Sequence, residues 1–261
     1  MAISAAATDR AAQEDGIDAY FICATPRTGS SLLLGLLEST GVAGRPEAYF
    51  RAPGESMWAD RWQLPRASDG AFSYADYLRA ARSAGTTENG VFGAKVMWGT
   101  LDEVVDKLGT VYPSLAGADL TLLTRAFGRT RFVYLNRDDV LAQAVSWLRA
   151  EQTGTWSVGS SEATGQAPSF DPDRIGELIR MVNEHNAAWE RWFGSFGIHP
   201  YRVRYEELEA DMSAVTRGIL DFLGLELPAG RSIVPQHQRQ ADELNRQWVA
   251  RYSTSAAPPP Y

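Results

Sequence analysis

Short apolar runs alternate with longer amphipathic stretches along this chain. A strand that is covered on both faces is apolar throughout, whereas a surface helix is apolar on one face only. The pattern therefore predicts strands over 20–24, 91–97, 131–136 and 199–205, and helices over 30–39, 138–152, 173–193, 212–223 and 239–252. Strands that alternate with helices in this way predict an α/β fold with a central, mostly parallel sheet flanked by helices on both faces.

Composition divides the chain into one domain and two ends. Apolar residues make up 44% of the sequence, with 8 Trp, 10 Tyr and 10 Phe, which is enough for a sizeable core. We expect disordered termini over 1–17 and 253–261 and a single domain over 18–252. Residues 154–172 are rich in Gly, Ser, Thr and Pro, so we expect a long loop there that is a candidate lid.

Charge and cysteine content exclude several classes of protein. The net charge of −7 argues against a nucleic-acid partner and against binding to acidic membranes. No apolar stretch reaches the roughly 18 residues of a membrane span, and residues 1–16 lack the apolar run of a signal peptide. Cys23 is the only cysteine, so neither a disulfide within the chain nor a multi-cysteine metal site can form. We expect a cytoplasmic protein without stable membrane insertion.

Residues 24–31 (Ala-Thr-Pro-Arg-Thr-Gly-Ser-Ser) join a predicted buried strand to a predicted helix. The N–H groups at a helix N-terminus and the helix dipole attract anions. Ser30 and Ser31 add hydroxyl groups, and Arg27 adds a guanidinium that matches phosphate or sulfate oxygens. The segment predicts a phosphate-binding loop, although a serine cap after an ordinary turn would give the same pattern.

The loop differs from that of nucleotide triphosphatases, which has a Lys directly after its last Gly. Here Ser30 follows Gly29, and the cation lies upstream at Arg27. No strand end offers a convincing acidic ligand for Mg²⁺. A metal-free phosphosulfate therefore suits this loop better than ATP does.

Further motifs follow in order along the chain. They are the segment Gly41–Phe50, Gly93–Trp98 (Gly-Ala-Lys-Val-Met-Trp), Asn136–Trp147 and Arg239–Tyr252. In order and spacing they resemble the bacterial sulfotransferases typified by the mycobacterial trehalose 2-sulfotransferase, which use 3′-phosphoadenosine 5′-phosphosulfate (PAPS). The similarity runs from about residue 20 to 252. It implies a P-loop-type three-layer fold, PAPS as donor, a hydroxyl acceptor, no metal, and a homodimer.

The resemblance also assigns the donor site residue by residue. The residues that it implies are Arg27, Thr28, Gly29, Ser30 and Ser31 for the 5′-phosphosulfate, Arg137 and Ser146 for the 3′-phosphate, Tyr205 for adenine, and Arg239 and Gln240 for closure over the 3′-phosphate. The product would be 3′,5′-adenosine bisphosphate. Other roles are open for each: a surface ion pair with Asp138 or Asp139 for Arg137, a core position for Tyr205, and solvated helix faces for Ser146, Arg239 and Gln240.

Sulfuryl transfer also needs a cation at the leaving oxygen and a base for the acceptor proton. Arg27 is the candidate cation, and Lys95 is a weaker one. The base of the family is a Glu before two aromatic residues, and Ala48 occupies that position here, in Pro46-Glu47-Ala48-Tyr49-Phe50. Glu47 could replace it, or His185 or Glu55 could. The alternative that we favour from the sequence is that a Glu-to-Ala change has disabled the base and left donor binding intact.

The acceptor pocket follows from the same resemblance. We expect it to be lined by Pro26, Arg45, Pro46, Glu47, Tyr49, Phe50, Arg51, Trp58 and Trp62. Tryptophans near a polar loop suit stacking on a sugar, although they could equally pack in the core. Glu47 and Arg51 stand where the family type has Gln, and residues 57–72 depart from it. The acceptor is therefore a carbohydrate, a glycolipid or another natural product, and trehalose is not specifically implied.

Two other functions remain open from the sequence. A P-loop kinase-like phosphotransferase is disfavoured, because the loop Lys and the Mg²⁺ carboxylate are missing. A non-catalytic nucleotide-binding protein would keep the loop and lack the base, as Ala48 allows.

Overall fold

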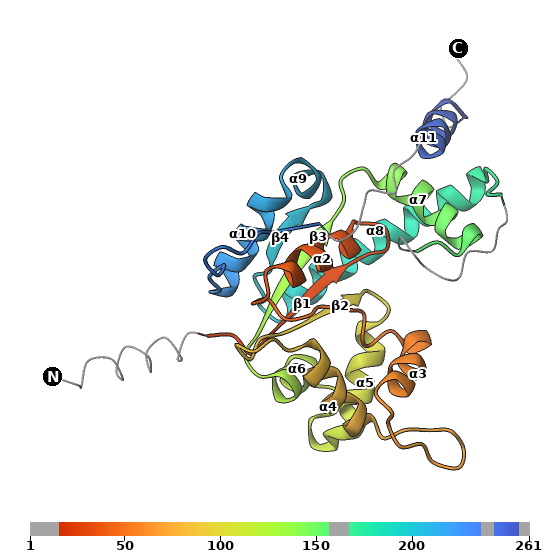
Figure 1. Cartoon of the computed structure of the whole chain (residues 1–261). Coiled ribbons are helices and arrows are strands. Elements are labelled where there is room, and N and C mark those ends of the chain that lie inside the picture. The colour runs from red at the N-terminus through yellow and green to blue at the C-terminus, as the bar shows by residue number, and fades with distance from the viewer. Residues whose placement is uncertain (1–15, 157–166, 236–242, 256–261) are drawn as a thin grey trace.

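A parallel sheet forms the centre of the structure (Figure 1). The structure, a computed structural model, describes residues 16–156, 167–235 and 243–255. In these residues the sheet has the strand order β2-β1-β3-β4, and every neighbouring pair is parallel. The strands are β1 (Ala19–Ala24), β2 (Phe92–Met97), β3 (Thr130–Asn136) and β4 (Tyr201–Arg204).

The apolar run that predicts β1 is explained by burial on both faces. All six residues of β1 are buried. Phe21 and Cys23 pack into the core on one side of the sheet, and Tyr20 and Ile22 pack into the core on the other. Side chains alternate across a strand, so only a continuously apolar sequence fits this central position.

Helices cover both faces, which confirms the predicted α/β fold with a mostly parallel sheet. The helices are α2 (Ser30–Ser39), α3 (Ala52–Arg61), α4 (Tyr74–Gly85), α5 (Leu101–Val111), α6 (Asp119–Phe127), α7 (Val140–Thr153), α8 (Pro172–Ser195), α9 (Tyr205–Ala210), α10 (Met212–Leu223) and α11 (Glu243–Ser255). Helices α2 and α10 pack on one face, and α4, α5, α6 and α8 pack on the other. Figure 1 shows α3 to α6 gathered on one side of the sheet, away from α9 and α10.

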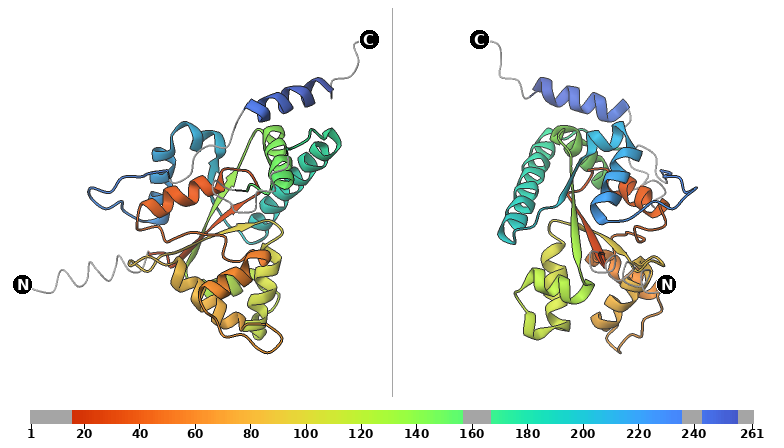
Figure 2. Two further views of the ribbon diagram at one scale, coloured as in Figure 1. Left: turned by 45° about the vertical axis from the view of Figure 1, so that its right-hand side comes forward. Right: turned by 90° about the vertical axis from the view of Figure 1, so that its left-hand side faces the viewer.

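A smaller core joins α7, α8 and α11. Trp248 of α11 is buried with Leu148 of α7 and Leu178 of α8. Figure 2 shows α11 at the edge of the molecule, next to α7. The helix continues to Ser255, three residues beyond the domain end expected at 252. No helix of the described ranges is long and apolar enough to cross a membrane.

The predicted elements between residues 20 and 39 and between 130 and 223 are present, with ends shifted by a few residues. Helices α2 and α10 have the predicted bounds. Helices α3, α4, α5, α6 and α9 were not among the predicted elements. The expected lid over 154–172 corresponds to the connection between α7 and α8, and its residues 157–166 lie outside the described residues.

Replacing Phe21 tests the two-sided burial of β1. Its ring is 1% exposed and contacts Phe92, Phe127 and Phe132. Because the cavity would be closed in by rings on several sides, we expect Phe21→Ala to lower the free energy of unfolding by about 3–5 kcal/mol. Chemical denaturation measures this loss. Met57 is 57% exposed, so the control Met57→Ala should change the free energy of unfolding by less than about 0.5 kcal/mol. Equal losses in the two variants would contradict the described core.

Candidate functional site

The loop over residues 25–29 follows the carboxyl end of β1 and leads directly into α2. Arg27 and Gly29 have φ values of 67° and 80°, in the left-handed region. Left-handed residues within a tight turn direct successive backbone N–H groups into one concavity, which is an anion-binding arrangement. The N-terminus of α2 adds its own free N–H groups at the same place.

Side chains from α7 and α8 hold the other side of this loop. The Gln143 Nε2 donates to the Thr25 hydroxyl at 2.9 Å and to the Pro26 carbonyl at 2.7 Å. The Trp189 Nε1 donates to the carbonyl of Ala24 at 3.0 Å. The Thr28 hydroxyl is fully buried and donates to the Thr25 carbonyl at 2.9 Å, so it braces the loop rather than facing a ligand.

Arg27 forms the centre of a cluster of guanidinium groups. Its Nε donates to the Ser146 hydroxyl at 3.0 Å, and its Nη1 donates to the carbonyl of Trp156 at 2.6 Å. Burial, together with the positive charges of Arg137 and Arg149, lowers the pKa of Arg27 to about 10, and Tyr205 partly opposes this shift. Arg27 is still charged near neutral pH. Several cations thus share a poorly solvated site, and an anion would relieve their repulsion.

Tyr205 lies over the loop. A Cβ atom at Gly29 would come within 2.6 Å of the Tyr205 ring, so only glycine allows this approach. The guanidinium carbon of Arg137 lies 4.6 Å from the centre of the same ring, a cation–π contact. The Arg137 Nε is buried and has no hydrogen-bond partner among the described residues. A buried donor without an acceptor costs about 1–3 kcal/mol, so this atom indicates a place for a ligand oxygen.

A surface ion pair of Arg137 with its neighbours in sequence is not present. Asp138 pairs instead with Arg204 at 3.2 Å. Asp139 caps α7 by accepting a hydrogen bond from the backbone of Ala142 at 2.9 Å. Both carboxylates are therefore engaged elsewhere.

Lys95 of β2 lies on the other side of the loop. Its ammonium nitrogen is 3.5 Å from the Ser30 hydroxyl. Burial is the main cause that lowers the pKa of Lys95. The negative charge of Glu47 opposes this shift, and the positive charges of Arg51 and Arg27 reinforce it. The backbone of Glu47 runs beside β2, because the Lys95 N–H donates to the Glu47 carbonyl at 2.9 Å. The exposed Glu47 and Arg51 are therefore the charged neighbours of Lys95 on the outer side of the sheet.

Of the aromatic residues expected in the acceptor pocket, Tyr49 and Phe50 lie in the core, and Trp58 and Trp62 pack against it. Tyr49 and Phe50 are 3% and 0% exposed. Trp58 and Trp62 are half-buried and stack on each other with centroids 5.3 Å apart, and both contact the Tyr49 ring. Aromatic rings bury large apolar areas when they pack together in this way.

Arg45 and Pro46 are also separated from the loop. The Arg45 guanidinium donates to the Thr86 carbonyl at 2.9 Å, beside the amino end of β2, whereas the loop follows the carboxyl end of β1. Pro46 is buried. Of the expected acceptor-side residues, the structure places Pro26 in the loop and Glu47 and Arg51 near Lys95.

The candidate replacements for the family base are not equivalent. Glu55 is 7% exposed and forms an ion pair with Lys107 at 2.8 Å, and burial raises its pKa. His185 lies half-buried on α8, where burial lowers its pKa. Ala48 is half-buried, and its N–H lies 3.4 Å from the Glu47 carboxylate. Glu47 is thus the exposed acid beside Lys95.

Some candidate residues cannot be placed, and others were missed. Arg239 and Gln240 lie outside the described residues. Sequence reasoning missed Arg149, which follows Ser146 by one helical turn on α7 and donates to Asn245 of α11 at 2.8 Å. The spacing of three residues from Ser146 was the signal that could have found it. Within the described ranges, no group of three or more His, Cys, Asp or Glu could hold a metal ion.

Comparison with known proteins gives consistent matches. A family model described as Stf0 sulphotransferase matches residues 19–255. The trehalose 2-sulfotransferases of Mycobacterium tuberculosis and Mycolicibacterium smegmatis are 28% and 29% identical over 256 and 260 residues, covering 91% of this chain and 95% of each relative. Among solved structures, the sulfotransferase domain of a Synechococcus olefin synthase is 14% identical with a TM-score of 0.47, covering 95% of this chain and 91% of that one. A sulfotransferase from Alicyclobacillus acidocaldarius is 15% identical with the same TM-score, covering 90% and 91%.

Sulfate tests the guanidinium cluster without any nucleotide. Binding to the folded state raises the melting temperature, so sulfate should raise it more than chloride does at equal ionic strength. This extra rise should disappear in Arg27→Gln and Arg137→Gln, because each removes a cation of the cluster. The exposed Arg217 of α10 provides the control Arg217→Gln, which should keep the full effect. Equal effects of sulfate and chloride on the unmodified protein would contradict the anion site. Thermal denaturation followed by circular dichroism gives the measurement.

Proposed function

Because the chain belongs to the Stf0 sulphotransferase family, we propose that it transfers the sulfuryl group of PAPS to a hydroxyl of a carbohydrate, glycolipid or other natural product. The observation that carries this proposal is the guanidinium cluster around a left-handed, glycine-containing loop. The donor would bring two anionic groups, the 5′-phosphosulfate and the 3′-phosphate. A site with several cations and no metal-binding acidic cluster in its described part fits such a ligand.

Several structural observations support the fit of the residues at the loop to the donor. The absence of a side chain at Gly29 lets the Tyr205 ring lie directly against the loop that would hold the 5′-phosphosulfate. The buried Arg137 Nε lacks an acceptor that a 3′-phosphate would provide, and Ser146 lies with Arg27 in the same cluster. The Tyr205 ring is the flat surface for adenine in this arrangement. Ser30 and Ser31 contribute N–H groups at the start of α2.

The chain's own cations would act on the leaving group. PAPS supplies the sulfuryl group, which passes to the acceptor oxygen as 3′,5′-adenosine bisphosphate leaves. Arg27 and Lys95 lie at the loop, where they would stabilise negative charge at the bridging oxygen. Burial of both cations strengthens this effect, since water screens them less.

We assign the removal of the acceptor proton to Glu47, in place of the family residue that Ala48 replaces. Glu47 is exposed and near Lys95, whereas Glu55 is held by Lys107. The proton of the hydroxyl would pass to the Glu47 carboxylate as the oxygen attacks sulfur. The second candidate, a nucleotide-binding protein without catalysis, is favoured by Ala48 alone.

The acceptor and the assembly are also proposals. The two relatives are named for sulfation of trehalose, which supports a carbohydrate acceptor here. Arg51 and Glu47 place one positive and one negative charge beside Lys95, which suits an acceptor with several polar groups. We further propose a homodimer, which light scattering would show as twice the mass of the 28.7 kDa chain.

Calorimetry with 3′,5′-adenosine bisphosphate tests donor binding. Each guanidinium makes charge-assisted hydrogen bonds of about 1.5–3 kcal/mol, so Arg27→Ala and Arg137→Ala should each weaken binding roughly 10- to 100-fold. Arg217→Ala, on the exposed face of α10, should leave the affinity unchanged. If the unmodified protein shows no heat of binding, or if the two site variants bind as tightly as it does, the proposal fails.

Substitution of Glu47 separates catalysis from donor binding. Loss of a general base costs about 10²–10⁴-fold in rate, so Glu47→Gln should reduce kcat by this factor and leave nucleotide affinity unchanged. Transfer of radiolabelled sulfate from PAPS to a panel of sugars and glycolipids measures the rate. Ala48→Glu is the matched variant, which restores the family pattern.

The same experiment decides between the alternatives. Full activity in Glu47→Gln would show that another group takes the proton. No transfer by the unmodified protein, together with transfer by Ala48→Glu, would mean that the base is disabled. No transfer by either, with nucleotide binding intact, would favour the non-catalytic protein.

A further inference from the structure

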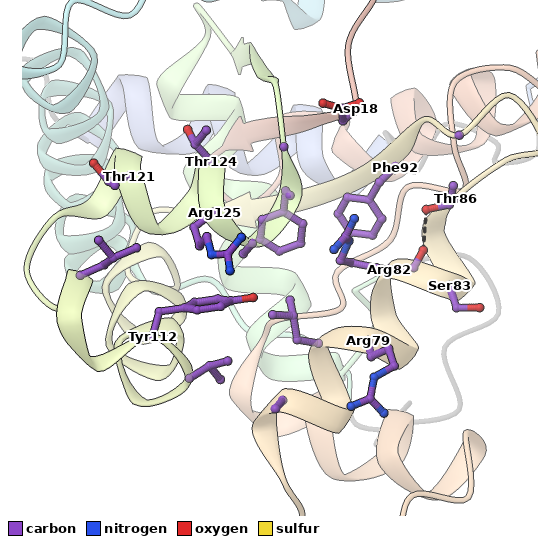
Figure 3. Close-up of a pocket in the computed structure, with 18 of the residues that line it drawn as sticks. Asp18, Arg79, Arg82, Ser83, Thr86, Phe92, Tyr112, Thr121, Thr124 and Arg125 are labelled. Carbon is purple, nitrogen blue, oxygen red and sulfur yellow. Dashed lines mark hydrogen bonds between the residues drawn. The ribbon is translucent and has the colours of Figure 1, made fainter.

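A cavity lies at the amino ends of the strands, opposite the end of the sheet that carries the loop over residues 25–29. It has a volume of about 1510 Å³ and lies between α4 and α6 (Figure 3). Asp18, Phe92 and Gly128 line it, and each lies at or just before the amino end of a strand. The loop over residues 25–29 follows the carboxyl end of β1, so the length of the strands separates it from this cavity. We call this cavity the α4–α6 groove.

Basic side chains form the rim of the groove, although the chain as a whole carries a net charge of −7. The basic rim consists of Arg45, Arg79, Arg82 and Arg125. Arg82 and Arg125 form no ion pair with a carboxylate of the described residues, and Arg125 lies over the Tyr112 ring at 5.5 Å. Figure 3 shows Arg125 on the α6 side, across from Arg79 and Arg82 of α4.

Two acidic residues near the rim, Asp18 and Asp76, are engaged in ion pairs, one with Arg129 outside the rim and one with Arg79 of the rim. Asp18 pairs with Arg129 at 3.2 Å, and this contact lowers its pKa. Asp76 pairs with Arg79 at 2.9 Å, but both side chains are exposed, so water screens this pair strongly. Glu88 is the other acid of the lining. The groove therefore keeps an excess of positive charge.

Apolar side chains form the floor. The apolar floor consists of Leu78, Phe92, Leu115, Leu120 and Phe127. Leu78, Phe92 and Phe127 are nearly completely buried, and Leu115 and Leu120 are half-exposed in the groove. An inorganic anion would use the rim and leave this floor in contact with water. A neutral lipid would use the floor and leave the arginines without a partner.

We propose that the α4–α6 groove binds an amphipathic organic anion, an alkyl or acyl chain with one anionic head group. The chain would cover the apolar floor, and the head group would lie between Arg82 and Arg125. Burying a CH₂ group gains about 0.8 kcal/mol, so affinity should rise with chain length. The cavity exceeds the 300–1,000 Å³ that is common for small-molecule sites, which leaves room for a long chain.

Dodecanoate below its micelle concentration is the probe. We expect one molecule to bind per chain and to shift the methyl NMR signals of Leu78, Leu115 and Leu120. Dodecyltrimethylammonium tests the need for negative charge, and acetate tests the need for the chain; neither should shift these signals. In the double variant Arg82→Gln and Arg125→Gln, the affinity for dodecanoate should fall at least tenfold. Arg217→Gln is the matched control and should bind normally.

Vesicles distinguish the source of the anion. Binding of free dodecanoate alone would support a soluble ligand, and additional binding to vesicles that contain phosphatidate would support the head group of a membrane lipid. The proposal is overturned if dodecanoate does not bind, if the signals of other regions shift instead, or if the double variant binds as well as the unmodified protein. Leu120→Asn gives a second test, since it should weaken dodecanoate binding while all arginines remain. Nucleotide affinity, measured on the same samples, should not change in any of these variants.

Discussion

The guanidinium of Arg27 is largely shielded from water in the loop that follows β1. Its hydrogen bonds go to the Ser146 hydroxyl and the Trp156 carbonyl, and Arg137 and Arg149 add positive charge nearby. Positive charges that lie close together in a poorly solvated site repel one another, so an anion bound among these guanidinium groups would be stabilised by all of them. The folded chain is therefore expected to gain stability from an anion at this position, and this coupling underlies the proposed donor binding.

The architecture keeps this cluster in place through elements far apart in the sequence. The parallel strands bring the loop after β1 and the turn after β3 to the same edge of the sheet, where ligands of open α/β sheets usually bind. Gln143 of α7 and Trp189 of α8 hydrogen-bond to the backbone on the far side of the loop, and the start of α9 places Tyr205 over it. Side chains from three helices far apart in the sequence therefore hold the loop in position.

Much of the fold could be predicted because it depends on local patterns. The leucines of α2 recur at helical spacing, and the residues of β1 are apolar without interruption. Helix α3 was missed because Pro53 and Gly54 at its start are typical of a loop. Helix α6 contains Thr121 and Thr124, β-branched residues that favour helices weakly.

The site could be predicted only in part. Arg27, Arg137, Ser146 and Tyr205 were candidates, and the structure brings them together around Gly29. Their proximity depends on strand order, which no local pattern contains. Tyr49 illustrates the opposite case: its place in an aromatic motif suggested a pocket, but its packing against Trp58, Trp62 and Phe92 places it in the core.

The most direct test of the central claim is a crystal structure of the protein with 3′,5′-adenosine bisphosphate. We expect the 5′-phosphate on the backbone N–H groups of Gly29 to Ser31 beside Arg27, and the 3′-phosphate on the Nε of Arg137 and on Ser146. This expectation would be contradicted by a nucleotide bound at another place, by phosphates in the reversed order, or by phosphates that do not contact these arginines.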